Sequence, residues 1–460
     1  MNEYHEFIAS KHHRSERHGF TCPDLPSRLF PHQQAALEFA CEQGRSALFL
    51  DTGLGKSGCE TVYADICARR ENRPSLILAP LAVARQMQRE AEAFGVEARV
   101  VREQSEVFTG VNIANYERMG KLDPSAFCAV VLDESSILKS FTGSTKRALC
   151  ENFSATPYRM ACTATPAPND HMELGQHSEF LGYLGSMEML CRWFINDTST
   201  ASQDWRLKGH ATGDFWAWVA SWARAASLPS DLGGQDDGFI LPPLTHELHV
   251  AGVDVSENTG DLLFRIPDQS ATSIHNEKKL TLQARAEMAA TVANGTKDAV
   301  IVWCERDDES QLITSMIPDA IEVKGSMTLE RKEAALDAFT SGDARVIVTK
   351  PKLAGFGLNW QHCATQVFAS ISYSYEQYYQ AIRRSWRFGQ KRPVKAHIVI
   401  ADTERPIWAT VQRKAADHDR MKAAMASAMR MAQREAETVE AYTRAPKFIF
   451  PEWLGGSNAA

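Results

Sequence analysis

The sequence predicts an α/β protein with two domains, each built on a parallel β-sheet that helices cover. Short apolar runs alternate with helical patterns in residues 28–184 and again in residues 281–402, which is typical of parallel sheets buried on both faces. A tryptophan-rich tract of different composition separates the two series. The chain has 460 residues, which is enough for two or three separate hydrophobic cores.

The strand and helix candidates follow in chain order. The strands of the first domain are expected at 47–50, 76–79, 111–114, 129–132 and 160–163, with a helical pattern at 81–94. The strands of the second domain are expected at 299–303, 345–349, 366–369 and 396–400, with helices at 281–293, 328–340 and 375–387. Strands that alternate with helices in this way predict parallel neighbours.

Three further segments complete the predicted organisation: an N-terminal arm at 1–27, an inter-domain insertion and linker at 185–280, and a helical tail at 403–460. The insertion ends in a glycine-, proline- and aspartate-rich stretch that is typical of a loop. In the tail, methionines recur every four residues, and such a stripe predicts packing on a core rather than ligand binding. The methionines of the stripe are Met421, Met425 and Met429.

The composition is that of an ordinary soluble protein, with 44% hydrophobic and 23% charged residues. The sequence lacks an apolar run of membrane-spanning length, a signal-peptide pattern and C-x-x-C pairs, so a cytoplasmic protein is expected. The net charge of −7 argues against purely electrostatic nucleic-acid binding but allows a local basic groove. His5, His12, His13 and His18 suggest either a metal-binding tract or, as the favoured interpretation, a solvated basic arm.

The stretch "LFLDTGLGKSG" (48–58) predicts a phosphate-binding loop between a strand and a helix. It follows the pattern G-x-x-x-x-G-K-[ST], except that Leu50 stands in place of the first glycine. The glycines would let backbone N–H groups approach phosphate oxygens, Lys56 would neutralise phosphate charge, and Ser57 would offer its hydroxyl to Mg²⁺. The alternative is a glycine-rich turn without function, which the position after a strand disfavours.

A second motif, "CAVVLDESS", carries two carboxylates at the end of a buried strand. Asp133 would hold Mg²⁺, and Glu134 would orient or deprotonate an attacking water. An isolated Asp-Glu pair is more often a solvated strand end. Beside a phosphate loop, however, the catalytic interpretation is favoured.

Together these motifs resemble those of superfamily 2 helicase-type ATPases, whose nucleotide loop commonly lacks the first glycine. The closer resemblance is to the Swi/Snf-like DNA translocase branch, in which the loop reads much like Asp-x-x-Gly-Leu-Gly-Lys-Thr, matched here by Asp51 to Ser57. The compact plan resembles bacterial and bacteriophage-encoded members. The resemblance extends over about residues 28–402 and implies two RecA-like domains in tandem.

Further motifs occur in the order that this branch shows, and they imply roles for individual residues. The residues implied to bind ATP are Gln33, which would read the adenine edge, and Thr52, Gly53, Leu54, Gly55, Lys56, Ser57, Gly357, Asn359 and Gln380. Thr163 and Thr165 of "CTATP" are implied to couple hydrolysis to strand contact. The residues implied to contact nucleic acid are Pro80, Asn115, Tyr116, Lys324, Gly325, Thr349 and Lys350.

The motif "QAIRRSWRFGQ" (380–390) supplies positive charge from the second domain. Arg384 and Arg387 lie three residues apart, and we expect them on one face of the helix at 375–387. They match arginine fingers, which stabilise charge on the leaving γ-phosphate; the alternative is a surface arginine cluster. Arg383 has no counterpart in the branch and is expected to be a surface charge.

Four positions depart from the branch or leave two interpretations open. Ser136 replaces a histidine that links ATP to the second domain, which puts that contact in doubt. Trp386 can stack on a base or pack in the protein, and packing is favoured. Trp205 and Lys208 combine an aromatic ring with a positive charge and suit nucleic-acid contact, although plain packing is an equal alternative.

The resemblance implies an ATP- and Mg²⁺-dependent motor that moves along duplex or branched DNA without sequence preference. It would act in the cytoplasm of a bacterial or phage-infected cell, with a monomer as a plausible state. One alternative is a strand-separating DNA or RNA helicase, and another is a nucleic-acid-binding scaffold that does not hydrolyse ATP. A metabolic phosphotransferase fails to explain the second α/β domain and its arginine pair.

Overall fold

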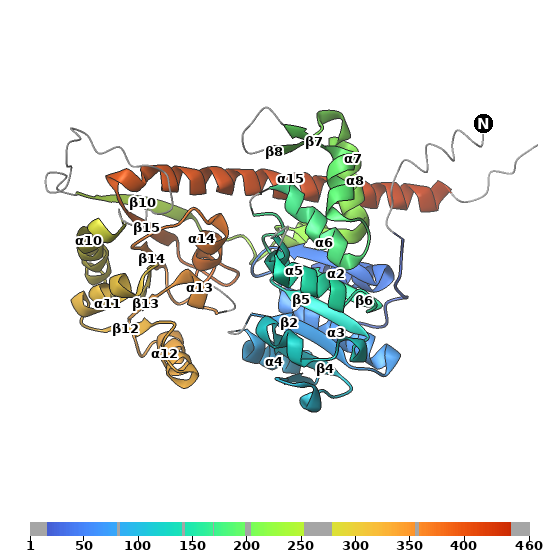
Figure 1. Cartoon of the computed structure of the whole chain (residues 1–460), viewed down its shortest axis with the longest axis horizontal. Helices are drawn as coiled ribbons and strands as arrows, with labels where there is room; N and C mark the ends of the chain where they lie inside the picture. The colour runs from blue at the N-terminus through green and yellow to red at the C-terminus, as the bar shows by residue number, and fades with distance from the viewer. Residues whose placement is uncertain are drawn as a thin grey trace, which may run out of the picture.

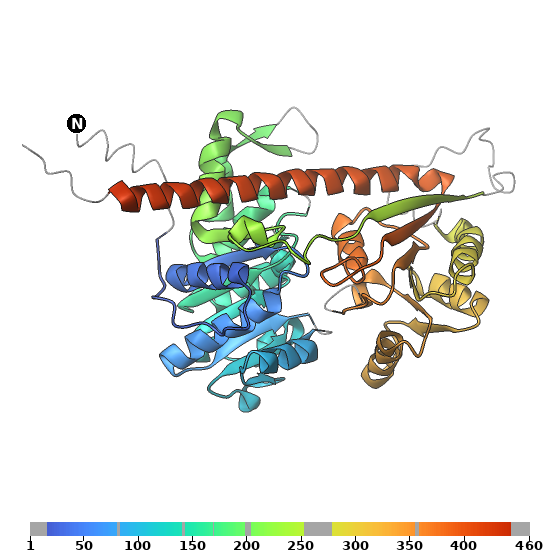
Figure 2. The same cartoon turned by 180° about the vertical axis from the view of Figure 1, so that it is seen from behind.

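The computed structural model describes residues 16–80, 83–139, 143–168, 170–197, 204–252, 278–354 and 358–442. They form two α/β domains side by side and one long helix, α15, that runs across both (Figures 1 and 2). The predicted fold class, two parallel-sheet domains in tandem, is confirmed.

The first domain holds a seven-stranded parallel sheet in the order β3-β4-β2-β5-β6-β1-β9. All five predicted strands are present, because each is largely apolar and almost entirely buried in the sheet. The strands are β1 (Arg45–Leu50), β2 (Ser75–Ala79), β3 (Ala98–Val100), β4 (Val111–Asn115), β5 (Ala129–Asp133), β6 (Tyr158–Cys162) and β9 (Ala223–Ala226).

Helices cover both faces of this sheet, and alternate strand residues feed two separate cores. Leu48 and Ile77 pack in the core under the first three helices, whereas Phe49 and Leu78 pack in the core under the others. The first group is α2 (Pro31–Gln43), α3 (Lys56–Glu71) and α4 (Ala84–Ala93). The second group is α5 (Ser144–Asn152), α6 (Leu174–Leu181), α7 (Ser186–Trp193) and α8 (Thr212–Trp222).

The structure places most of the tryptophan-rich tract inside the first domain, and not between the domains as expected. Trp193, Trp218 and Trp222 are buried in the second core, and β9 extends the sheet beside β1. Burial of these large rings against the sheet is the physical reason that the first domain continues beyond residue 184. Between α7 and α8 lies an antiparallel hairpin of β7 (Phe194–Asp197) and β8 (Asp204–Leu207).

The second domain holds a six-stranded parallel sheet in the order β10-β15-β14-β11-β13-β12. The four predicted strands are present, while β10, at the sheet edge, falls in the segment expected to be a linker. The strands are β10 (Leu244–Ala251), β11 (Val300–Trp303), β12 (Ala320–Val323), β13 (Val346–Thr349), β14 (Thr365–Phe368) and β15 (Val394–Ala401). The helices are α10 (Leu282–Asn294), α11 (Asp307–Met316), α12 (Leu329–Ser341), α13 (Pro351–Ala354) and α14 (Tyr375–Ile382).

The helix expected at 375–387 ends at Ile382, so Arg384 and Arg387 do not lie on a helix face. The carbonyl of Arg384 accepts a hydrogen bond from the amide of Trp360 (2.9 Å) instead of from the next helical turn. The chain therefore leaves the helix as a series of turns, and the two arginines are placed by loop contacts.

Helix α15 (Arg405–Tyr442) joins the two domains along one side of the molecule. Its first turns pack Trp408 and Val411 into the core of the second domain. Further along, Met421, Met425 and Met429 are buried in the core of the first domain, which confirms the packing role predicted for the stripe. Among the described helices, none is both long and apolar enough to span a bilayer.

We expect Met425→Ala to lower the free energy of unfolding by about 2–4 kcal/mol, because it leaves a cavity where α15 meets the first domain. Met425 is 1% exposed, whereas Met431 on the same helix is 61% exposed. Met431→Ala is therefore the control and should change stability little. Chemical denaturation of both variants measures this, and equal stability of the two would contradict the docking of α15.

Candidate functional site

The predicted phosphate loop connects β1 to α3 at the edge of the sheet where the strands end. Gly53 and Gly55 have φ angles of 98° and 77°, a left-handed region that favours glycine. A Cβ atom on Gly55 would lie 1.9 Å from Nε2 of the Gln33 side chain. The loop therefore requires glycine at this position for close packing as well as for its backbone conformation.

Lys56, the first residue of α3, lies with its amine over the loop. Its Nζ donates to the carbonyl of Leu50 (2.8 Å). Its positive charge also lowers the pKa values of Asp133 and Glu134, although burial acts more strongly in the opposite direction. The structure thus brings together the three residues that the sequence placed on the phosphate and metal side of the site.

Asp133 and Glu134 stand at the carboxyl end of β5, the strand between β2 and β6. Burial, followed by repulsion from Glu134, raises the pKa of Asp133 to about 7. Glu134 has a φ of 52°, which is unusual for a residue with a side chain and marks local strain of the kind found at functional sites. Glu134 accepts a hydrogen bond from Thr163 Oγ1 (3.3 Å), and Thr163 Oγ1 in turn accepts from the amide of Thr165 (3.0 Å).

Sequence reasoning missed Glu60, one turn after Lys56 on α3. Its side chain is 0% exposed, and neither carboxylate oxygen has a hydrogen-bond partner among the described residues. Burial, followed by repulsion from Asp133, raises the pKa of Glu60 well above its usual value. Its spacing of four residues from Lys56 on a helix is the only sequence signal that could have pointed to it.

The second domain reaches this acidic group through the end of α14 and the turns that follow it. Gln380 Nε2 donates to Glu134 Oε2 (3.2 Å), and Gln380 Oε1 accepts from Arg384 (3.2 Å). Arg384 and Arg387 both donate to the carbonyl of Leu358. Burial, followed by repulsion from Arg387, lowers the pKa of Arg384 to about 9, while Glu134 and Asp133 act in the opposite direction.

Phe388 of the second domain lies against the phosphate loop. A Cβ atom on Gly53 would lie 2.7 Å from the Cβ and 2.9 Å from the backbone nitrogen of Phe388, so the backbones of the loop and of Phe388 lie against each other. Phe388 also stacks on Phe239, with ring centroids 4.4 Å apart. The contact leaves no space for a larger residue at position 53.

The side-chain amide of Gln33 forms hydrogen bonds with backbone groups. It accepts from the amide of Phe30 (2.9 Å) and donates to the carbonyls of Leu54 (3.2 Å) and Gly55 (3.3 Å). The residue therefore lies beside the phosphate loop as expected. Its predicted reading of an adenine edge would require it to exchange these partners.

Arg383 is buried and is not the surface charge that the sequence suggested. Its guanidinium forms an ion pair with Asp51 of the phosphate loop (2.7 Å). The misjudged position has a simple reason: the partner lies more than 300 residues away in sequence and in the other domain. Trp386 packs as favoured, and its indole N–H donates to the carbonyl of Pro242 (2.7 Å).

The residues implied to contact nucleic acid are scattered, and several already have protein partners. The hydroxyl of Tyr116 donates to the carbonyl of Asp133 (2.7 Å), and Thr349 is 0% exposed, so neither side chain is available as the resemblance implied. The remaining contacts are Lys350 with Asp307, Lys324 with Glu322, and Lys208 with the carbonyl ends of α7. Trp205 packs on the second core, Pro80 and Asn115 are half-buried, and Gly325 is exposed. Asn359, which the resemblance implies to bind ATP, is also exposed.

Some of the predicted residues lie outside the described part of the chain. They are Gly357, His5, His12 and His13. His18 is described, and its backbone amide donates to the carbonyl of Gln43 (3.0 Å).

The acidic end of the cleft fits Mg²⁺. This ion prefers carboxylate and hydroxyl oxygens, which Asp133 and the half-buried Ser57 supply. Glu60 lies in the same buried place, where burial and repulsion from Asp133 raise its pKa, and Lys56 is the described first-domain cation that acts in the opposite direction. A divalent cation would therefore relieve repulsion that the chain itself leaves unbalanced.

Comparison with protein families gives one match: residues 283–389 match the helicase conserved C-terminal domain. Among solved structures, S. cerevisiae Dbp5 bound to RNA and ADP BeF3 superposes with a TM-score of 0.54 at 12% identity, covering 88% of this chain and 94% of that chain. A single-substitution variant of Dbp5 in the same complex gives a TM-score of 0.55 at 12% identity, with 87% and 93% covered.

The fold is a tandem RecA-like helicase fold. At this level of identity the likeness shows the fold alone. The Sulfolobus solfataricus SWI2/SNF2 ATPase core in complex with dsDNA aligns at 16% identity over 90% of this chain and 98% of that chain. Its TM-score of 0.41 is too low to support a conclusion. Comparison with curated proteins gave no match.

The raised pKa of Asp133 predicts how the Asp133→Asn substitution changes stability with pH in nucleotide-free protein kept in EDTA. The pKa rises from 3.8 to about 7, so between these values the folded chain holds a proton that the unfolded chain releases. The wild type therefore loses stability as pH rises through this window, whereas asparagine does not titrate.

We expect Asp133→Asn to stabilise the protein more at pH 8 than at pH 5, by on the order of 2–3 kcal/mol, because the wild type loses stability up to a pH of about 7. Asp337→Asn, on the exposed side of α12, is the matched control. Denaturant melts at several pH values measure the difference between variant and wild type. A difference that stays constant from pH 5 to pH 8 would contradict the assigned environment of Asp133.

Proposed function

We propose that the chain is an ATP- and Mg²⁺-dependent motor of the superfamily 2 helicase type that moves along nucleic acid. One observation carries this proposal: Gln380 of the second domain donates to Glu134 of the first, so both domains complete one site. The helicase-type C-terminal match over 283–389 includes Gln380, Arg384 and Arg387, which supports the same conclusion.

The residues divide the chemistry between them. Backbone N–H groups of Gly53 and Gly55 and the amine of Lys56 would hold the phosphates, while Ser57 and Asp133 would hold Mg²⁺, which would supply positive charge to the transferred phosphoryl group. Glu134 orients the attacking water and accepts its proton. Arg384 and Arg387 stabilise the charge that develops on the γ-phosphate.

Hydrolysis is linked to movement through two residues that contact Glu134 from different domains. Thr163, which follows β6 in the first domain, donates a hydrogen bond to Glu134, and Gln380 of the second domain donates another. When the γ-phosphate leaves, the arginines lose the charge that holds the domains closed. Each cycle then changes the distance between the nucleic-acid grips of the two domains.

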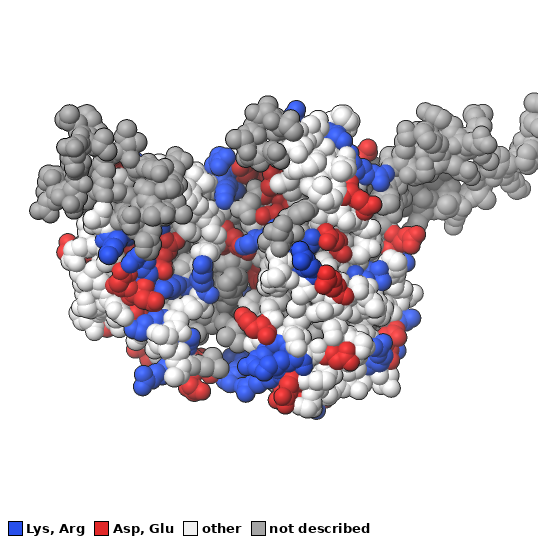
Figure 3. Space-filling model, viewed as in Figure 1, with Lys and Arg blue, Asp and Glu red and all other residues white. Residues whose placement is uncertain are grey.

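We further propose DNA as the track and a compact Swi/Snf-like motor acting as a monomer in a bacterial or phage-infected cytoplasm. Figure 3 shows basic side chains gathered over the region of α4 beside the gap between the domains. Arg85 and Arg89 are exposed on this helix, which follows Pro80, a residue that the resemblance implies to contact nucleic acid. Contacts of this kind grip phosphates and carry no sequence information.

RNA is the second candidate track. The solved neighbour Dbp5 is described as bound to RNA, and this chain shares its fold over 88% of the sequence. The structure of the ATP site is the same for either track, so only a comparison of nucleic acids decides between them.

The first experiment is steady-state ATP hydrolysis without nucleic acid and with single-stranded DNA, duplex DNA, branched DNA and RNA. We expect DNA to stimulate hydrolysis, and Lys56→Ala and Arg387→Ala to reduce it by about 10³-fold because each removes charge that stabilises the transition state. Arg405→Ala, an exposed arginine paired with Asp402, is the control and should behave as the wild type. Stimulation by RNA alone would overturn the DNA assignment, and no hydrolysis at all would favour the scaffold alternative.

The second experiment is a salt titration of DNA affinity. Because binding by phosphate contacts releases counterions, we expect affinity to fall by at least about tenfold between 50 and 200 mM salt. Arg89→Ala should reduce the slope against salt by about one phosphate contact. An affinity that does not change with salt would count against a backbone grip.

A further inference from the structure

We propose that Arg383 and Lys422 are positioning residues that hold Asp51 at the base of the phosphate loop. Through them, the second domain and α15 set the position of a loop that belongs to the first domain. The inference rests on the function proposed above, and it adds residues that the motifs of that function leave out.

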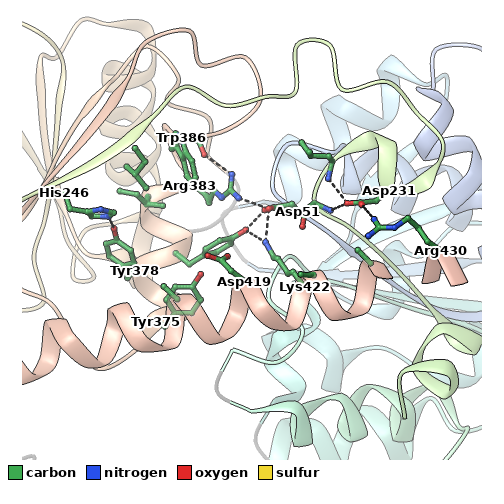
Figure 4. A pocket seen from close by; sticks show the side chains of 18 residues that line it. Asp51, Asp231, His246, Tyr375, Tyr378, Arg383, Trp386, Asp419, Lys422 and Arg430 are labelled. Atoms are coloured by element: carbon green, nitrogen blue, oxygen red, sulfur yellow. Dashed lines mark hydrogen bonds and ion pairs between the residues drawn. The ribbon is translucent and has the colours of Figure 1, made fainter. Parts of the chain in front are cut away.

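Asp51 is the meeting point of three parts of the chain (Figure 4). Its Oδ2 accepts from Arg383 Nη2 of the second domain (2.7 Å) and from Lys422 Nζ of α15 (2.8 Å). Its Oδ1 accepts from the hydroxyl of Tyr379 and from the amide of Thr52 (2.6 Å). Both oxygens of one side chain are therefore divided between the loop itself and the two elements that lie against it.

The cluster is buried, and its charges depend on one another. The side chains of Arg383, Lys422 and Asp51 are 7%, 13% and 9% exposed. Burial alone would raise the pKa of Asp51, but attraction by Arg383 and Lys422 outweighs it and holds this pKa below its usual range. Removal of one partner leaves a buried charge without compensation, which is strongly unfavourable.

Ion pairs, and not continuous packing, connect the loop to α15 at this level. A cavity of about 600 Å³ adjoins the cluster, and its lining includes Tyr375, Tyr378, Trp386 and Asp419 (Figure 4). The side chain of Asp51 therefore contacts the second domain and α15 through Arg383, Tyr379 and Lys422.

A displaced Asp51 would alter the phosphate site directly. Its side chain binds the amide of Thr52, and its carbonyl accepts from the amide of Leu54 (3.2 Å). These amides belong to the loop that is proposed to surround the phosphates. Loss of either cation should therefore weaken nucleotide binding, an effect that a purely structural brace at this distance would not produce.

The test compares Lys422→Met and Arg383→Met with Arg420→Met. Arg420 lies two residues from Lys422 on α15, is 78% exposed and pairs only locally with Asp417, so it is the matched control. The first readout is the affinity of a fluorescent ADP analogue in the full-length protein without nucleic acid. The second is hydrogen exchange of the amides from Thr52 to Gly55.

We expect both cluster variants to bind the analogue about tenfold more weakly than the Arg420→Met control and to exchange the loop amides faster, at unchanged circular dichroism. Lys422→Arg, which keeps the charge, should recover most of the affinity. Affinity and exchange within twofold of the control in both variants would overturn the inference. If a variant fails to fold, the isosteric Asp51→Asn replaces it in the same comparison, with the same criterion.

The readouts separate this inference from the proposed function because neither requires hydrolysis. A wild type that binds the analogue but never hydrolyses ATP would refute the motor. The ratio of affinities between Lys422→Met and Arg420→Met would still decide the positioning role.

Discussion

The structure depends on a group of buried carboxylates that the first domain cannot neutralise by itself. Asp133 ends β5 and Glu134 follows it, Glu60 lies nearby on α3, and Lys56 is the one first-domain cation among the described residues whose charge lowers the pKa values of all three. Buried charge of one sign is unfavourable unless a partner supplies the other. The second domain supplies Gln380 and Arg384, and a metal–nucleotide complex would supply the rest. Closure of the domains and the chemistry of the site therefore have the same electrostatic origin.

Topology explains why these groups meet. In a parallel sheet the carboxyl ends of all strands lie at one edge, so the loops after β1, β5 and β6 converge there although they are far apart in sequence. The loop after β1 binds phosphate, the one after β5 carries the acids, and the one after β6 carries Thr163. The second domain presents the end of α14 and the turns that follow it to this edge, which is how residues 380–388 reach the first domain.

Much of this arrangement could be predicted from sequence, because apolar strands and glycine-rich loops are local signals. All nine predicted strands are present, and Lys56, Asp133 and Glu134 lie together. Contacts that depend on distant partners could not be predicted. In the sequence, Arg383 cannot be distinguished from an exposed arginine, because its partner Asp51 lies in the other domain. The composition around α8 did not indicate which surface its tryptophans cover. The strand β10 could not be predicted, because it lies in a segment whose sequence resembles a linker.

Helix α15 makes the two domains into a three-part assembly, since it packs on the cores of both and places Lys422 at the phosphate loop. The central claim, that the second domain completes the chemistry of a site on the first, is tested most directly with Arg384→Ala. Nucleotide affinity and single-turnover hydrolysis should be measured on the same preparation. The account predicts that affinity changes by less than about tenfold while hydrolysis falls by about 10³-fold. Hydrolysis that stays at the wild-type rate, or that falls only in proportion to affinity, would contradict it.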